Sequence, residues 1–335
     1  MAECQRLVLL GDVLELRHGP LSAALAAAQP ALSAIGAALA PGCEVLIVPG
    51  NHDHHLLNAW LERRAGLDRP PPLGLELEVD WRDGEPLAAL AGWLGAGRTR
   101  VAYPGAWLRE DVYATHGHYG DRHTTVPMLE RLGAGAMARI VHEPAGGPRR
   151  AEDYEATLAP IYAWIHAIAQ TGGPALGRSS HGPSAQAWRF LAGSEGRSSW
   201  RQRIAAAAFP AVVAALNCAR LGPLRADLSG AELRRAGLAA VGDVLVALRV
   251  AAAHVIFGHT HRAGPLPGDD CLEWRAPTGA AMLNTGSWVH EPAFLGARPR
   301  ASPYRAGFCV TLGAREPPRL RCLLDDASPG VKQTA

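Results

Sequence analysis

Histidines, carboxylates and an asparagine gather in four short segments of this chain. The segments are GDVLE at 11–15, GNHDHH at 50–55, THGHYGDRH at 115–123 and GHTHR at 258–262. Imidazole nitrogens combined with carboxylate and amide oxygens form a donor set that suits divalent transition metals such as manganese, iron and zinc. The composition of the four segments therefore predicts a metal-dependent reaction.

Each of these segments follows or ends a run of residues with the pattern of a short buried strand. Ligands in open α/β sheets bind at the carboxyl ends of the strands, so we expect the four segments to meet at one edge of a sheet. The predicted strands are RLVLL (6–10), EVLIVP (44–49), VYAT (112–115), HVIF (254–257), AMLNTG (281–286), GFCVTL (307–312) and RLRCLL (319–324).

Each segment also has a simpler explanation when it is taken alone. Asp12 could cap a helix, Asn51 could be a turn residue, and His259 with His261 could form a polar turn. Four such segments at successive strand ends favour a shared metal site over unrelated loops. Glycine in each segment lets the backbone turn sharply and approach an ion closely.

In this order, GDVLE, GNHDH, THGH and GHTHR resemble the motifs of the calcineurin-like metallophosphoesterase family, and NTGSW at 284–288 extends the resemblance. The resemblance implies an α/β fold in which a two-sheet β-sandwich is flanked by helices. It also implies two divalent ions, manganese, iron or zinc, bound at the strand ends.

The resemblance assigns five metal ligands to this sequence. Asp12 would bridge the two ions, Asn51, His116 and His259 would bind the second ion, and His261 would bind the first.

The resemblance also implies a catalytic pair, in which His52 acts as a proton donor or transition-state stabiliser and Asp53 orients it. Three further residues are candidates for contact with substrate phosphate: His118, Arg122 and Arg262. Alternatively, the polar residues that follow His116, including Asp121, could hold the ligand imidazoles in one tautomer.

The expected reaction is hydrolysis of a phosphate monoester or diester. Two cations roughly 3.5–4 Å apart would lower the pKa of a water molecule and clamp an in-line displacement. A non-catalytic metal-binding or regulatory module of the same fold is the alternative. A metallo-β-lactamase-type hydrolase requires H-x-H-x-D-H, whereas here Asp53 interrupts the histidine run and no D-H pair follows.

One motif of the family has no counterpart. The family carries Asp-x-His upstream of GDVLE, but the ten residues before Gly11 contain neither Asp nor His. The first ion would keep only Asp12 and His261, so we expect impaired activity. We also expect a missing upstream strand and roughly 25–45 missing residues, because a βαβ crossover needs a dozen or more.

Sequence patterns divide the chain into a discontinuous core, 1–139 and 251–335, and a mainly helical insertion at 140–250 that should cover the metal site. Residues 21–40 are expected to form a helix broken at Pro30, which links the first two strands as a βαβ unit. The apolar run 204–216 predicts a buried helix, with contact to an acyl chain as a second option.

The composition of the chain limits which substrates and cellular locations we expect. The net charge of +2 gives no indication of nucleic acid binding. The family resemblance implies a phosphoester substrate, which we expect to be a small molecule or lipid-linked, with nucleotides, phosphoproteins and nucleic acids left open. The six cysteines form no C-x-x-C pair, as in a reduced cytosolic protein. No apolar run is long enough to cross a bilayer and no signal peptide is apparent, so we expect a cytoplasmic protein.

Overall fold

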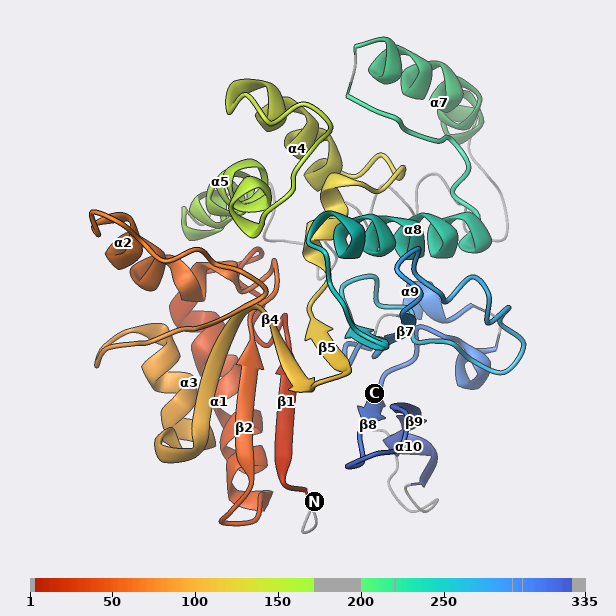
Figure 1. Cartoon of the computed structure of the whole chain (residues 1–335). Helices are drawn as coiled ribbons and strands as arrows, with labels where there is room; N and C mark the ends of the chain where they lie inside the picture. Colours follow the sequence, from red (N-terminus) through yellow and green to blue (C-terminus); the bar gives the residue numbers. More distant parts are fainter. Residues whose placement is uncertain (1–3, 172–199, 220, 291, 297, 327–335) are drawn as a thin grey trace.

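A curled, mixed sheet of seven strands forms the centre of the protein (Figure 1). The computed structural model describes residues 4–171, 200–219, 221–290, 292–296 and 298–326. The strands are β1 (Arg6–Leu10), β2 (Glu44–Val48), β3 (Glu76–Glu78), β4 (Thr99–Arg109), β5 (Val112–Thr115), β6 (His254–Phe257) and β7 (Ala281–Asn284). Strands β8 (Phe308–Thr311) and β9 (Arg319–Cys322) pair separately.

The strand order is β1-β2-β4-β5-β6-β7, and β3 pairs with β4. Strand β4 is antiparallel to β3 and β5, whereas the other neighbours in the seven-stranded sheet run parallel. Helices flank the sheet, so the predicted α/β class is confirmed. The helices are α1 (Leu21–Ala38), α2 (Asn58–Ala65), α3 (Pro86–Leu94), α4 (Leu129–Ile140), α5 (Ala151–Gln170), α7 (Trp200–Cys218), α8 (Gly230–Ala247), α9 (Pro292–Leu295) and α10 (Leu323–Asp326), with short 3₁₀ turns η1 (His54–Leu57), η2 (Ala96–Arg98), η3 (His118–Arg122) and η4 (Pro299–Ala301).

All seven predicted strands are present, but the sequence patterns miss β3 and β4. Strand β4 contains a Pro-Gly pair at 104–105, which reads as a turn. Tertiary pairing overrides this local preference, because β4 lies between β2 and β5 and Pro104 is paired with Glu76 of the three-residue strand β3.

Helix α1 connects β1 to its parallel neighbour β2, as predicted, but the expected break at Pro30 is wrong. The helix continues from Leu21 to Ala38, with Pro30 on its exposed side. Within the described part of the chain, α1 is the one helix with the length and composition of a membrane span. Its packing against α3, where Gly36 lies against the carbonyl of Trp93, is that of a crossover helix, so the described residues include no clear transmembrane segment.

Helices predominate in the described part of the segment between β5 and β6, and the first long helix begins at Leu129 rather than at 140. Figure 1 places α4, α5, α7 and α8 beyond the upper ends of the strands. Helix α5 shares one buried cluster with the sheet, in which Leu158 and Ile161 join Val45 and Ile47. Helix α5 therefore packs into the core; residues 172–199 lie outside the described part.

The apolar run at 204–216 lies in helix α7, but the expected burial is wrong for the side chains that are described. From 208 to 218 only Val213 is buried, and its neighbour Val212 is 52% exposed. The side chains of 204–207 lie outside the described residues.

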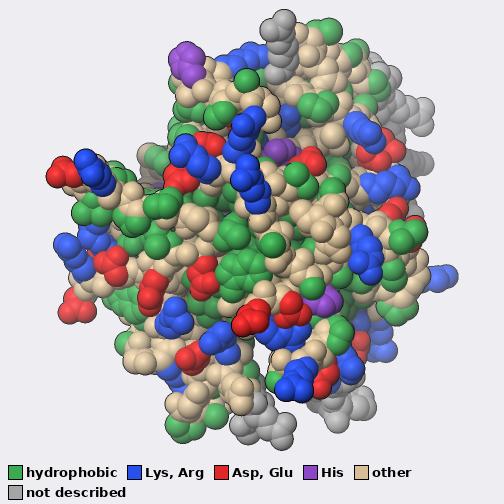
Figure 2. All heavy atoms as spheres, viewed as in Figure 1, with side chains coloured by type: hydrophobic (Ala, Val, Ile, Leu, Met, Phe, Trp, Pro, Cys, Tyr) green, Lys and Arg blue, Asp and Glu red, His purple; other side chains and the backbone are tan. Residues whose placement is uncertain are grey.

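The surface carries charges of both signs. Figure 2 shows Lys and Arg side chains interspersed with Asp and Glu over this face, rather than collected in one basic area. This distribution agrees with the small net charge of +2. All six cysteines are free thiols.

Candidate metal centre

The structure brings four of the predicted ligand residues together at the carboxyl ends of β1, β2, β5 and β6. Oδ2 of Asp12 lies 3.2 Å from Nε2 of His116. The same nitrogen is 3.3 Å from Oδ1 of Asn51, which in turn is 3.2 Å from Nδ1 of His259. Four donor atoms from four separate loops therefore form one continuous cluster.

Two glycines make this close approach possible. A Cβ atom on Gly11, which has a φ of 83°, would lie 2.0 Å from Nδ1 of His116. A Cβ atom on Gly50 would lie 2.4 Å from Oδ1 of Asp12 and 2.7 Å from the His116 ring. Any side chain at either position would displace a member of the cluster.

Backbone strain also concentrates here. Asp12, His259 and His261 have φ values of 54°, 62° and 60°. This left-handed conformation costs a residue with a Cβ about 1–2 kcal/mol. Such strain persists where the surrounding structure fixes it and is characteristic of functional sites.

Hydrogen bonds determine which nitrogen of each imidazole faces the cluster. Nδ1 of His116 donates to the carbonyl of Leu10 at 3.0 Å, which leaves the lone pair of Nε2 facing Asp12 and Asn51. Nε2 of His259 donates to Asp121 at 2.7 Å, which leaves the lone pair of Nδ1 facing Asn51. Atoms that all offer lone pairs repel one another unless a proton or a cation lies between them.

The charges of Asp12 and His116 stabilise each other. Burial favours the neutral imidazole of His116, but the carboxylate of Asp12 outweighs burial and raises the pKa of His116 to about 9. Burial would likewise raise the pKa of Asp12, yet His116 and His52 hold it well below its ordinary value. A proton on Nε2 of His116 and a divalent cation would compete for the same position.

The remaining predicted ligand, His261, lies near the same carboxylate. Burial lowers the pKa of His261 to about 4, so its imidazole is neutral at pH 7. The described residues contain no group of three or more His, Cys, Asp or Glu side chains that is arranged to hold an ion. Asp12 and His261 are the only predicted ligands of the first ion.

Asp53, predicted to orient His52, forms its hydrogen bonds with the backbone instead of with the His52 side chain. Oδ1 of Asp53 accepts a hydrogen bond from the backbone of Gly50 at 2.7 Å, and Oδ2 accepts one from the backbone of Val13 at 2.7 Å. Asp53 therefore joins the two loops that carry Asp12 and Asn51. Nδ1 of His52 instead lies 2.5 Å from Oε2 of Glu15.

His52 is enclosed by residues that the sequence motifs did not identify. Besides Glu15 at Nδ1, Nη1 of Arg17 lies 3.1 Å from Nε2, and Arg17 also forms an ion pair with Glu130 of α4. Burial would lower the pKa of His52, but Asp12 and Glu15 outweigh it and raise the pKa. The positions of Glu15 and Arg17 just after Asp12 could have indicated this role, whereas Glu130 gave no sequence signal.

His118, a predicted substrate contact, is buried against Tyr103 in the structure. His118 is only 1% exposed, and its Nε2 lies 3.0 Å from the hydroxyl of Tyr103. Asp121 follows the alternative hypothesis, since its carboxylate holds one tautomer of the ligand imidazole His259. Both residues belong to η3, which directly follows His116.

The two arginines that were predicted to contact phosphate are instead paired with acidic side chains. Arg122 forms an ion pair with Glu143, and Arg262 forms a bidentate one with Asp269 at 2.6 and 2.9 Å. Neither guanidinium is presented to a phosphate in this arrangement.

Asn284, the first residue of the NTGSW segment, holds the loop of His259 in place. Its Nδ2 donates to the carbonyl of Gly258 at 2.7 Å and to the hydroxyl of Thr260 at 2.9 Å. Helix α8 supports the same loop, because a Cβ atom on Gly237 would lie 3.1 Å from the Thr260 side chain. Helix α8 therefore contacts the loop that carries His259.

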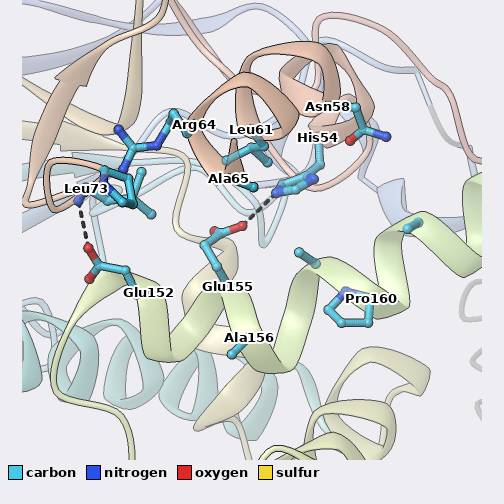
Figure 3. Close-up of a pocket in the computed structure, with 13 residues that line it drawn as sticks. His54, Asn58, Leu61, Arg64, Ala65, Leu73, Glu152, Glu155, Ala156 and Pro160 are labelled. Atoms are coloured by element: carbon cyan, nitrogen blue, oxygen red, sulfur yellow. Dashed lines mark hydrogen bonds and ion pairs between the residues drawn. The ribbon is translucent and has the colours of Figure 1, made fainter. Parts of the chain in front are cut away.

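A cavity of about 550 Å³ lies between α2 and α5, and no candidate ligand lines it. Figure 3 shows His54 and Glu155 paired across it, with Glu152 directed at the backbone of Leu73. Its lining is largely apolar, with residues such as Leu61 and Ala156. The chemistry and the cavity are therefore at different places in the fold.

Comparisons with known proteins give no relative of this chain. No family model, no curated protein and no solved structure matches it. The functional inference therefore depends on the motifs and on the geometry of the site.

Proposed function

We propose that this chain is a metal-dependent phosphoesterase whose ion lies among Asp12, Asn51, His116 and His259. The spacing of the four donor atoms carries the proposal, since consecutive atoms are 3.2 to 3.3 Å apart. Ligand bonds of ~2.0–2.2 Å place neighbouring ligand atoms about 3.0–3.5 Å apart around an ion. The three contacts form a chain rather than a closed group, so binding one ion would require the donors of Asp12 and His259 to converge on it.

The motif resemblance supports the reaction type. Its four segments contribute this donor set, and the calcineurin-like metallophosphoesterases hydrolyse phosphate esters. The two-sheet sandwich of that family, the manganese, iron or zinc identity of the ion and a small or lipid-linked substrate belong to the same proposal. A second ion would have only Asp12 and His261 as predicted ligands, so we infer that the other position is filled first and most tightly.

The residues around the ion position would have separate roles in catalysis. When bound, the ion would lower the pKa of a water molecule and offset charge on the phosphoryl oxygens. Glu15 fixes the ring of His52 through Nδ1, and Nε2 accepts from Nη1 of Arg17, so Nε2 would have to take up a proton and separate from Arg17 before it could donate to the leaving oxygen. The guanidinium of Arg17 adjoins that nitrogen and adds positive charge where the leaving group departs.

A non-catalytic metal-binding module is the second candidate, and the incomplete first-ion set favours it. The surroundings of His52 favour an enzyme instead, because binding an ion does not require the contacts of His52 with Glu15 and Arg17.

Metal content and turnover test the two candidates together. His116→Ala and His259→Ala should each abolish the tightly bound ion measured by elemental analysis. His254→Ala, at the start of β6, is the matched control and should retain it. Unchanged metal content in both ligand variants would refute the ion position. Manganese-dependent hydrolysis of an aryl phosphate diester by the parent protein would support the enzyme, and its absence in a metal-loaded protein would support the module.

A further inference from the structure

Four buried polar atoms beside the candidate centre have no hydrogen-bond partner within the described part of the chain. They are the hydroxyl oxygen of Tyr162, Oδ2 of Asp121, Nδ1 of His118 and Nε of Arg17. Only two other side-chain atoms of the described residues share this property, in Arg63 and Trp274. Buried polar groups are almost always hydrogen-bonded, so this concentration in one region requires a physical explanation.

The other three groups belong to residues near Tyr162, which lies on α5 and faces His118 of η3. Tyr162 is 4% exposed, and its ring centroid lies 5.9 Å from that of His118. Burial raises the pKa of the Tyr162 hydroxyl, and among charged groups Asp121 raises it most, whereas Arg17 lowers it. The hydroxyl therefore lies within the fields of a carboxylate and a guanidinium.

The hydrogen-bonding capacities of these atoms complement a small polar molecule. The Tyr103 hydroxyl donates to Glu155 at 2.5 Å, so it accepts from Nε2 of His118 and leaves a lone pair on Nδ1. Nδ1 of His118 and Oδ2 of Asp121 are then acceptors, Nε of Arg17 is a donor, and the Tyr162 hydroxyl can act as either. Water has two donors and two acceptors and suits such a set.

We propose that the Tyr162 hydroxyl and Oδ2 of Asp121 bind a buried water molecule, and that Tyr162 acts through it as a positioning residue for the His259 imidazole. Oδ1 of Asp121 already receives Nε2–H of His259 at 2.7 Å. A hydrogen bond to the other oxygen holds the carboxylate plane fixed, and the imidazole with it. The water site stands independently, whereas its consequence for ion binding rests on the proposed function.

Calorimetric titration with Mn²⁺ tests the consequence for the ion. Tyr162→Phe removes only the hydroxyl and should weaken binding about tenfold, the lower range for a group that supports a metal ligand. Tyr154→Phe is the matched control on α5, because its hydroxyl already has a direct partner in His123 at 2.7 Å. It should leave Mn²⁺ affinity within about twofold. Equal affinity of parent and Tyr162→Phe would overturn the positioning role.

Coupling separates positioning from a general loss of structure. If Tyr162 acts through Asp121, Tyr162→Phe combined with Asp121→Asn should weaken binding by less than the product of the separate effects. If the double variant loses as much Mn²⁺ affinity as the product of the two single losses, the two residues are not coupled. The unfolding midpoints of Tyr162→Phe and Tyr154→Phe should be measured in parallel. The midpoint of Tyr162→Phe should be no lower than that of Tyr154→Phe.

A high-resolution crystal structure of the parent protein decides the water site itself. We expect electron density for a water within hydrogen-bond distance of the Tyr162 hydroxyl and Oδ2 of Asp121. Direct bonding of these groups to other protein atoms would refute the site. If the parent binds no Mn²⁺, the proposed function fails, but this density still confirms or refutes the buried water.

Discussion

Nε2 of His259 lies 2.7 Å from Oδ1 of Asp121, and this contact determines the face that the imidazole turns to the cluster. With the proton held on Nε2, Nδ1 keeps an unshared lone pair 3.2 Å from Oδ1 of Asn51. A carboxylate that supports a histidine in this way also increases its basicity as a ligand.

Replacement of Asp121 should weaken the ion site without removing a ligand. Asp121→Asn keeps the shape of the side chain but loses its charge, so the affinity for Mn²⁺ should fall about 10- to 100-fold. Calorimetric titration measures it, with Asp111→Asn as the control, because Asp111 pairs with Arg109 in the β4–β5 turn. Equal losses in the two variants would show that the effect is not specific to the site.

His52→Ala should retain the bound ion but lower kcat by ~10²–10⁴-fold, the usual contribution of a positioned general acid. Steady-state kinetics with an aryl phosphate diester, together with elemental analysis, separate the two effects. His142→Ala is an exposed control and should behave like the parent. Loss of the ion from His52→Ala would instead make His52 a ligand.

Gly50→Ala should disrupt the cluster from the backbone side. The added Cβ would lie 2.4 Å from Oδ1 of Asp12, so either the loop or the carboxylate must move. Such overpacking typically costs ~1–3 kcal/mol of unfolding free energy. Gly97→Ala is the control, since no atom lies within 4 Å of its added Cβ. Urea denaturation compares them, and equal stability would mean that the loop adapts without strain.

Acid should destabilise the fold partly through His123, whose Nε2 lies 2.7 Å from the hydroxyl of Tyr154. Burial, with smaller effects of Arg122 and Arg131, lowers its pKa from 6.5 to about 4. The unfolded chain therefore binds a proton below pH 6.5 that the folded chain accepts only near pH 4. Stability is present above pH 6.5 and is lost as the pH falls toward 4.

His123→Gln removes this titration and should flatten the fall in unfolding free energy between pH 6.5 and 4. Urea denaturation at several pH values measures the difference between the variant and the parent. Parallel curves for the two proteins would exclude a contribution from His123.

Short-range pattern was sufficient for most strands and for the helical character of the segment before β6. Apolar runs such as Val45–Val48 predict buried strands because both faces of the parallel strand are covered. The short-range pattern did not predict β4, in which Pro104 and Gly105 suggest a turn. It also did not predict that α1 continues through Pro30, which lies on the exposed side of the helix. Neighbouring elements outweighed the local preference in both places.

The sequence by itself determined the donor types and their positions at strand ends, because apolar strands followed by glycine and polar residues are a local pattern. Only the tertiary structure decided which side chains support them. Asp53 bonds to the backbone rather than to the side chain of His52. Glu15 contacts His52 in the way that was predicted for Asp53. Glu130 and Tyr162 reach the site from helices far along the chain. Such contacts depend on helix packing over long sequence separations, which short-range spacing does not encode.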